Sequence, residues 1–261
     1  MLMLLFIDLG RKVLNFMYFI GGLTSLAAQT VYLTLKPPYK YEHIIVQSKN
    51  AGYDSFPIVS VVALFIGFIF ALQSAYFMQR IGSEMYIASL VAMAIVRELG
   101  PVITALVVAG RVGASNTAEL GSMQVTEQID ALETMATNPV KYLVVPRFVA
   151  LSIMLPVLTL YANIIGIIGS YLICVWKLGI TGNMYMHITF NSLLYKDLFT
   201  GLFKSWIFGM LIALISCHEG FNVTGGAEGV GKATTRSVVF TFIMIIAADC
   251  FFTALFYFIF P

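Results

Sequence analysis

The chain has 261 residues, of which 59% are hydrophobic and only 11% are charged, and its formal net charge is +2. A soluble domain typically carries about 25% charged residues, so this composition excludes a soluble fold. The small net charge, with no dense block of basic residues, argues against a nucleic-acid surface, and we expect no nucleic-acid partner. Composition alone therefore predicts an integral membrane protein.

The first segment with spanning length covers residues 13–35, but several polar residues interrupt it. Basic residues flank it on both sides, at Arg11 and Lys12 and at Lys36 and Lys40. Such flanks favour a helix lying in the cytoplasmic membrane interface, although a sixth span stays open. The two prolines at 37 and 38 are expected to end this helix and to start a polar connector that reaches residue 54.

Five later stretches approach or exceed the ~20 apolar residues that a helix needs to cross the hydrocarbon core. They cover residues 56–78, 86–110, 148–176, 198–217 and 238–260. With the N-terminus inside, most of the fifteen basic residues fall in cytoplasmic segments, which include 114–146 and 218–237. We predict one all-α membrane domain over residues 1–261, with an interfacial helix and connector (1–55) before a five-span core (56–261).

Charged residues inside the predicted spans are the first candidates for function. Arg97 and Glu98 fall near the middle of the second span, where each charge costs about 2.5 to 3.5 kcal/mol on insertion scales. Pro101 would clash with the carbonyl of Arg97, which predicts a kink or break beside the pair. We interpret the pair as a polar point on a transport path; a structural ion pair between helices is the alternative.

Two further charges are predicted inside spans, Lys204 in the fourth and Asp249 in the last. They could meet across helices or each line a cavity, and an isolated buried Asp249 could simply be protonated. The sequence leaves these alternatives open.

The stretch 119–138 contains four acidic residues and no basic one. Its apolar residues Ile129, Leu132 and Ala136 recur at helical spacing, which predicts a short amphipathic helix capped by Thr126 and stopped at residues 138–139. Such a helix between two spans suits the docking of a cytoplasmic partner. An ordinary solvated loop helix is the alternative.

The remaining motifs point away from catalysis and from metal or nucleotide binding. Gly226, Gly231 and Lys232 match the spacing of a phosphate loop, but Ala233 stands where Ser or Thr should bind Mg²⁺, so we expect these glycines only to let the chain turn. The cysteines at 174, 217 and 250 show no CxxC spacing, and we expect no metal site. No hydrolase motif occurs, so we expect no enzymatic activity.

Three long stretches resemble one family. They are RELGPVITALVVAGRVG at 97–113, AELGSMQVTEQIDALETMATNPVKYLVVPR at 118–147 and GGAEGVGKATTRSVV at 225–239. Together they resemble the MlaE/YrbE permease family of the Mla and Mce lipid ABC transporters. The length and the order of spans also fit, so the resemblance covers nearly the whole chain.

The resemblance implies a homodimeric permease of the bacterial inner membrane that moves phospholipid, or in some Mce systems sterols or fatty acids. ATP and Mg²⁺ would bind a separate cytoplasmic MlaF-like ABC ATPase, and an MlaB-like STAS-domain protein can accompany it. An MlaD-like hexamer of MCE-domain protein would form a tunnel toward the outer membrane. Direction of transport is undetermined. An ion-coupled secondary transporter or channel is the alternative function.

The resemblance also implies roles for particular residues. The helix at 126–137 resembles the family's coupling helix, with Glu127, Asp130 and Glu133 as contacts to the ATPase. Residues expected by the central lipid cavity, with ordinary helix packing as the alternative for the apolar ones, are Phe70, Phe77, Met78, Ile81, Arg97, Glu98 and Leu99. Lys204 and Arg236 are candidate head-group or gating charges.

Overall fold

The structure is a computed structural model that describes residues 2–37, 40–80, 82–83 and 86–259. Over these residues it contains helices and no strand. Five helical rods are long and apolar enough to cross a membrane: Tyr41–Arg80, Ile87–Val125, Val140–Trp176, Tyr195–Phe221 and Gly226–Ile259. The predicted all-α fold with five spans is therefore confirmed.

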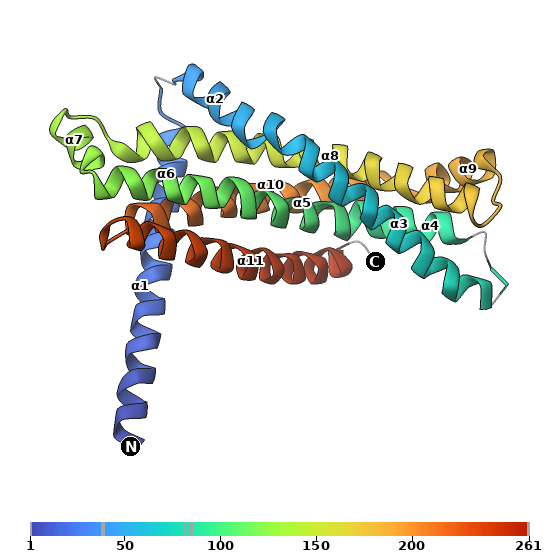
Figure 1. Cartoon of the computed structure of the whole chain (residues 1–261), viewed down its shortest axis with the longest axis horizontal. Helices are drawn as coiled ribbons and strands as arrows, with labels where there is room; N and C mark the ends of the chain where they lie inside the picture. The colour runs from blue at the N-terminus through green and yellow to red at the C-terminus, as the bar shows by residue number, and fades with distance from the viewer. Residues whose placement is uncertain (1, 38–39, 81, 84–85, 260–261) are drawn as a thin grey trace.

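The rods are built from shorter elements in chain order (Figure 1). The first joins α2 (Tyr41–Ala51), the 3₁₀ turn η1 (Tyr53–Ser55) and α3 (Phe56–Arg80). The second joins α4 (Ile87–Ala94), η3 (Ile95–Leu99), α5 (Gly100–Val108), η4 (Ala109–Gly113) and α6 (Ala114–Val125). After α7 (Gln128–Thr134) come η5 (Val140–Val144) and α8 (Val145–Trp176), then α9 (Gly182–Ser192), α10 (Tyr195–Phe221) and α11 (Gly226–Ile259).

The N-terminal helix α1 (Leu2–Thr34) runs steeply away from the other helices (Figure 1). It is not one of the five candidate spans, and it contacts α10, η5 and α8. Phe19 packs edge-on against His218 with ring centroids 5.1 Å apart, and a Cβ on Gly22 would lie 2.6 Å from Nε2 of that histidine. The second half of α1 therefore packs against the end of α10, and its placement in the membrane interface stays a prediction.

The predicted connector before residue 55 is largely helical. Residues 41–51 form α2, which packs on α8 and buries Ala51. Because α2 continues through η1 into α3, the first rod begins at Tyr41, well before the apolar run on which the prediction depended. Helix α1 ends at Thr34, before Pro37, as expected, and a new helix starts at Tyr41.

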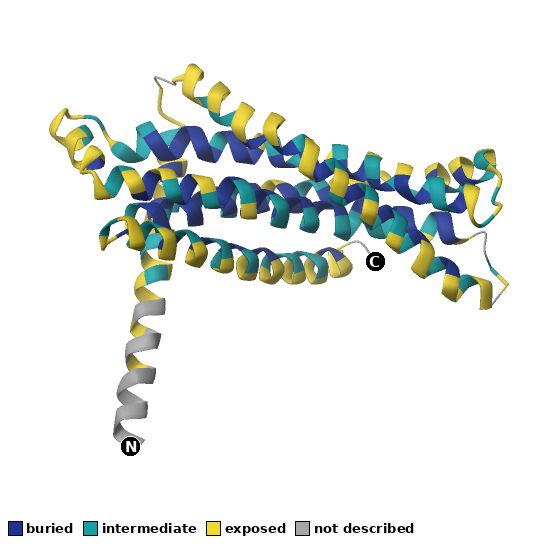
Figure 2. Ribbon diagram, viewed as in Figure 1, coloured by how far each residue is buried: buried dark blue, intermediate teal, exposed yellow. Residues whose placement is uncertain are grey.

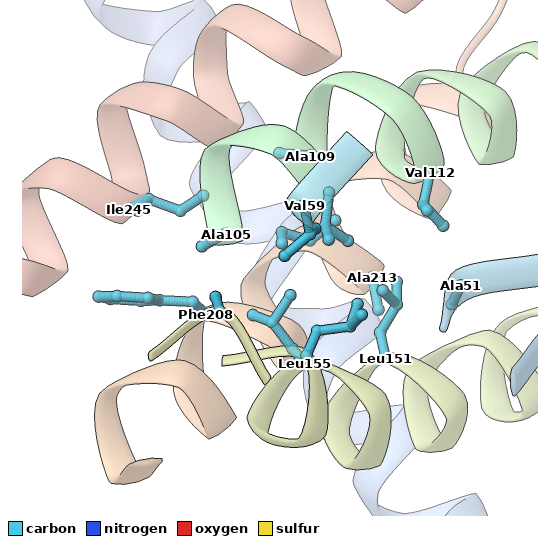
Figure 3. Close-up of a cluster of buried hydrophobic side chains, with 14 of the residues drawn as sticks. Ala51, Val59, Ala105, Ala109, Val112, Leu151, Leu155, Phe208, Ala213 and Ile245 are labelled. Carbon is cyan, nitrogen blue, oxygen red and sulfur yellow. The ribbon is translucent and has the colours of Figure 1, made fainter. Parts of the chain in front are cut away.

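The core is packed closely where glycines face neighbouring backbones. A Cβ on Gly169 would lie 2.6 Å from the carbonyl oxygen of Leu64, and one on Gly209 would lie 2.5 Å from that of Leu151. Small residues let membrane helices approach in this way. The apolar cluster at the centre joins α5, α8, α10 and α11 (Figure 3); its side chains include Ala105, Leu151, Leu155, Phe208 and Ile245.

Candidate functional site

The second rod carries its charged pair in a π-helical turn. Residues 95–99 form η3, and the N–H of Gly100 donates to the carbonyl of Ile95, five residues earlier. Of the predicted kink or break beside Pro101, the break is wrong, because the helix runs on for 39 residues; the irregularity there is the π turn. The wider turn accommodates a proline that cannot donate to the carbonyl of Arg97. Turns of this type frequently mark functional sites.

Glu98 belongs to a cluster of charges contributed by three helices. Lys204 Nζ on α10 lies 2.5 Å from Glu98 Oε2 and 2.9 Å from Asp249 Oδ1 on α11. It also donates to the hydroxyl of Thr253 at 2.7 Å, and this hydroxyl donates in turn to Glu98. We call Lys204, Glu98, Asp249 and Thr253 the Lys204 cluster. Lys204 and Asp249, whose relation the sequence left open, therefore meet across helices.

The Lys204 cluster is only partly sealed. Lys204 is 1% exposed, whereas the side chains of Glu98 and Asp249 keep 36% and 22% of their surface exposed. With both carboxylates ionised, one ammonium faces two negative charges. The cluster thus presents two partly exposed acidic side chains at the depth of the spans, where an uncompensated charge is costly.

Arg97 points to a different partner from its neighbour. Its Nη1 lies 3.6 Å from Oδ1 of Asp197, whose other carboxylate oxygen accepts a hydrogen bond from the backbone N–H of Leu194 at the start of α10. Arg97 and Glu98 are therefore not paired with each other. Arg97 instead ties η3 to the beginning of α10, and 41% of its side chain stays exposed.

The apolar candidates divide into two groups. Phe70, Met78 and Leu99 are half-buried against a second apolar cluster around α4 and the end of α8, so packing accounts for much of their surface. Phe77 is 56% exposed. Ile81 lies outside the described residues.

Two of the helices that contact α5 leave large apolar surfaces uncovered. Both α3 and α11 contact α5, and the apolar windows of their rods are only 28% and 11% buried. Figure 2 shows exposed residues along the outer sides of both helices. Asp249 therefore belongs to a helix whose apolar surface the chain itself leaves largely uncovered.

Arg236 lies at the other end of α11. Its Nε is 2.5 Å from Oε2 of Glu219, which is 2% exposed. Helical rise separates Arg236 from Asp249 by roughly 20 Å. The structure therefore does not bring Arg236 and Lys204, the two predicted gating charges, into one site.

The predicted coupling helix is shorter than expected. It is α7, seven residues long, and Glu127 at its N-cap has a left-handed φ of 58°. Residues 119–125 belong to α6, so they extend the second rod. Ile129 is buried and Leu132 packs on the same cluster, whereas Glu127, Asp130 and Glu133 are exposed.

The predicted boundaries of α7 need correction. Thr126 does not cap it, because its hydroxyl donates back to the carbonyl of Ser122 at 2.8 Å at the end of α6. Ala136 is exposed, with φ 57°, and so is not part of the apolar face. Asn138 starts the next helix, since its Oδ1 accepts from the N–H groups of Val140 and Lys141.

The phosphate-loop look-alike is the start of α11. Gly225 and Gly226 have φ of 91° and 69° and turn the chain between α10 and α11, as predicted for Gly226. Gly231 instead lies inside α11, so the prediction is wrong for it. Lys232 lies on the exposed surface of the helix, 2.6 Å from Glu228 one turn earlier.

Three polar contacts escaped sequence reasoning. Thr253 completes the Lys204 cluster and lies one turn beyond Asp249 on the same helix face, a spacing that could have revealed it. Glu219 is the buried partner of Arg236. Arg147, only 3% exposed, pairs with Glu119 at 2.8 Å, so Glu119 braces α8 against α6 and is not part of the acidic surface of α7.

Comparison with known proteins decides the family. The family described as Permease MlaE matches residues 44–255. The chain belongs to the MlaE permease family. This MlaE permease is 41% identical over 250 residues to a probable ABC transporter permease protein of Rickettsia felis, with 96% of each chain covered.

Relatives of this MlaE permease extend to photosynthetic organisms. It is 40% identical over 205 residues to a probable ABC transporter permease protein of Synechocystis, with 78% of each chain covered. It is 37% identical over 232 residues to the Arabidopsis chloroplast protein trigalactosyldiacylglycerol 1, covering 89% of this chain and 66% of that protein. This MlaE permease is thus an ABC transporter permease and a multi-pass membrane protein.

Proposed function

We propose that this MlaE permease moves phospholipid between the bacterial inner membrane and an MCE-protein tunnel leading toward the outer membrane. The observation that carries this proposal is the Lys204 cluster, which includes Asp249 and Thr253 of α11, a helix whose apolar surface is largely uncovered. Apolar side chains would shelter acyl tails while Glu98, Lys204 and Arg97 accommodate a head group. The Arabidopsis relative supports a lipid substrate, because its name refers to a glycerolipid.

The energetics explain why such a cavity needs an external driving force. Burying a methylene group is worth about 0.8 kcal/mol, so withdrawing a whole lipid from the bilayer costs tens of kcal/mol unless the protein replaces that apolar contact. ATP hydrolysis on a partner subunit would supply the work of opening and closing. In this proposal the permease itself catalyses no reaction.

We assign the ATPase contact to α7. Its apolar residues Ile129 and Leu132 fix it to the bundle, while Glu127, Asp130 and Glu133 face outward. The same end of the bundle carries the cytoplasmic lysines expected from the positive-inside rule. Closure of an MlaF-like ATPase pair would therefore move α7, and with it α6 and α8.

We further propose a homodimer formed through α3 and α11, because these helices leave the least-buried apolar windows. Two Lys204 clusters would then line one central cavity. An MlaD-like MCE hexamer would lie at the end carrying α9, with an MlaB-like STAS protein on the ATPase. Metal or nucleotide binding by this chain is not part of the proposal.

Native mass spectrometry of the tagged protein, gently extracted from its own membranes, tests the proposal. We expect two permease chains, two ATPase chains and retained phospholipid, with or without MCE subunits. A lone oligomer with no ATPase, and transport driven by an ion gradient, would instead favour an ion-coupled transporter that uses Glu98 and Asp249 as a proton relay.

A further inference from the structure

A cavity of about 380 Å³ lies at the α7 end of the bundle, between the end of α1, the start of α2 and η5. Its volume falls within the range of about 300 to 1,000 Å³ that is usual for small-molecule sites. Six of its lining residues carry the argument, and we call them the lysine pocket: Leu33, Lys40, Ile44, Lys141, Tyr142 and Val145. It is remote from the Lys204 cluster, with which it shares no residue.

The two lysines of the pocket have no counter-charge of their own. Lys141 Nζ lies 3.4 Å from the carbonyl oxygen of Pro37, and Lys40 Nζ lies 4.1 Å above the ring of Tyr142. Neither takes part in any ion pair formed by the described residues. Glu42 follows in the first turn of α2 but does not line the pocket. Two cations without an ion-pair partner among the described residues make this pocket a candidate anion site.

Apolar surface surrounds these cations. Leu33, Ile44 and Val145 form the walls of the pocket. Leu35, directly after α1, and Tyr41 and Ile45 on α2 are exposed. A positive centre beside exposed apolar side chains fits an amphipathic anion better than a soluble one, since a soluble anion gains nothing from the apolar rim.

We propose that the lysine pocket binds the phosphate of an anionic phospholipid in the cytoplasmic leaflet, separately from the transported lipid. The inference rests on the orientation proposed above, which places the α7 end in the cytoplasm. That leaflet has a negative surface, and basic pockets beside spans bind its head groups. The acyl chains would lie along the exposed apolar residues of α1 and α2.

Such a lipid would act on the coupling helix as well as anchor α1. Ala136, Thr137 and Asn138, which join α7 to η5, also line this cavity. Asn138 starts η5 through its bonds to Val140 and Lys141. A bound phosphate would therefore brace the joint through which α7 moves α8.

A binding titration in nanodiscs tests the proposal on the full chain. Discs of phosphatidylcholine receive increasing phosphatidylglycerol, and native mass spectrometry counts the phosphatidylglycerol retained per chain. Lys40→Gln/Lys141→Gln is compared with Lys177→Gln/Lys196→Gln, a matched pair of exposed lysines near α9 that lose the same charge. Both leaflets are accessible in a disc, so the result does not depend on the orientation or on the ATPase.

We expect roughly 25-fold weaker retention for the pocket variant, since each of its two lysines contributes about a fivefold factor to holding the same phosphate. For the control we expect at most about a twofold effect, because its lysines do not line the pocket. Ile44→Trp, which fills the cavity but keeps its charge, should also lose retention. Equal effects of both lysine pairs, or equal competition by glycerol phosphate, would overturn the lipid assignment. Displacement of the lipid by added ATPase would overturn it too, by identifying a protein-docking site.

Discussion

At the residue scale, Lys204 shows how a charge is accommodated inside a span. Its ammonium group contacts two carboxylates and a hydroxyl from two other helices, and almost none of its surface is exposed. Each contact compensates part of the cost of removing the ammonium from water. The same contacts leave Glu98 and Asp249 accessible, so one arrangement can serve stability and head-group binding together.

Replacing Lys204 by Met should destabilise the permease, because it leaves two acidic groups side by side without a cation. Breaking a buried ion pair typically costs about 3 to 5 kcal/mol, and we expect the lower end because solvent partly screens Glu98. The apparent melting temperature of the detergent-purified protein would report the loss.

A variant in which the Lys204 cluster carries no charge separates the contribution of the cluster to stability from its role in transport. The triple variant Glu98→Gln, Lys204→Met, Asp249→Asn should regain most of the melting temperature, since no unpaired charge remains. It should still fail to move phospholipid in proteoliposomes containing the ATPase. Full transport by this variant would reduce the Lys204 cluster to a structural ion pair.

Sequence reasoning found the charges of this site but not their partners. Lys204 and Asp249 stand out because charges are rare in spans, whereas Thr253 is inconspicuous. Which charges meet depends on the rotation of α10 and α11 about their axes, and that is set by packing contacts distant in sequence. The pairing of Arg97 with Asp197 instead of Glu98 has the same origin.

At the element scale, close packing of spans depends on single glycines. Gly209→Ala would place a methyl group 2.5 Å from the carbonyl oxygen of Leu151, so α10 must move away from α8. We expect a loss of about 1 to 3 kcal/mol, measured by denaturation in detergent. Gly231→Ala in α11, where no atom lies within 4 Å, should be neutral or stabilising. Equal effects would refute the packing argument.

The short helix α7 offers a second test at this scale. Asp130→Lys/Glu133→Lys should insert normally and weaken ATPase association at least about tenfold, because reversed charges at a complementary surface cost several kcal/mol. Co-purification at several salt concentrations measures the effect. Glu42→Lys, an exposed acid at the same end of the bundle, should leave association unchanged. Unaltered ATPase binding by the α7 variant would remove α7 from the interface.

Apolar runs predicted the spans well, but the shorter elements within and between the spans were harder to predict. Beside Pro101 the sequence predicts a kink or break, and the structure has the π turn η3 within a continuous helix. Thr126 fits a cap for α7 in sequence, yet its hydroxyl can equally bond one turn back, and the structure selects that bond. Where the local sequence favours two hydrogen-bonding patterns equally, tertiary packing decides which one forms.

At the scale of the whole molecule, the family and the five spans follow from sequence, whereas the distribution of buried surface does not. The window of α8's rod is 67% buried, against 11% for that of α11. Hydropathy is nearly the same for both, so composition cannot tell a central helix from a peripheral one. Only the arrangement of the bundle shows that α11 and α3 are available to a second subunit or to lipid (Figure 2).

The homodimer proposal can therefore be tested on α11. Ile243 is 56% exposed on this helix, and Ile153 on α8 is equally exposed. In a Cys250→Ser background, which removes the exposed native thiol, Ile243→Cys should form a cross-linked dimer in native membranes. Ile153→Cys should stay monomeric if its face of α8 meets only lipid. The reverse pattern would place the interface on α8. Cross-linking at neither position, with one permease chain per particle by mass spectrometry, would show that the chain acts alone, and a single Lys204 cluster would then have to serve the lipid path.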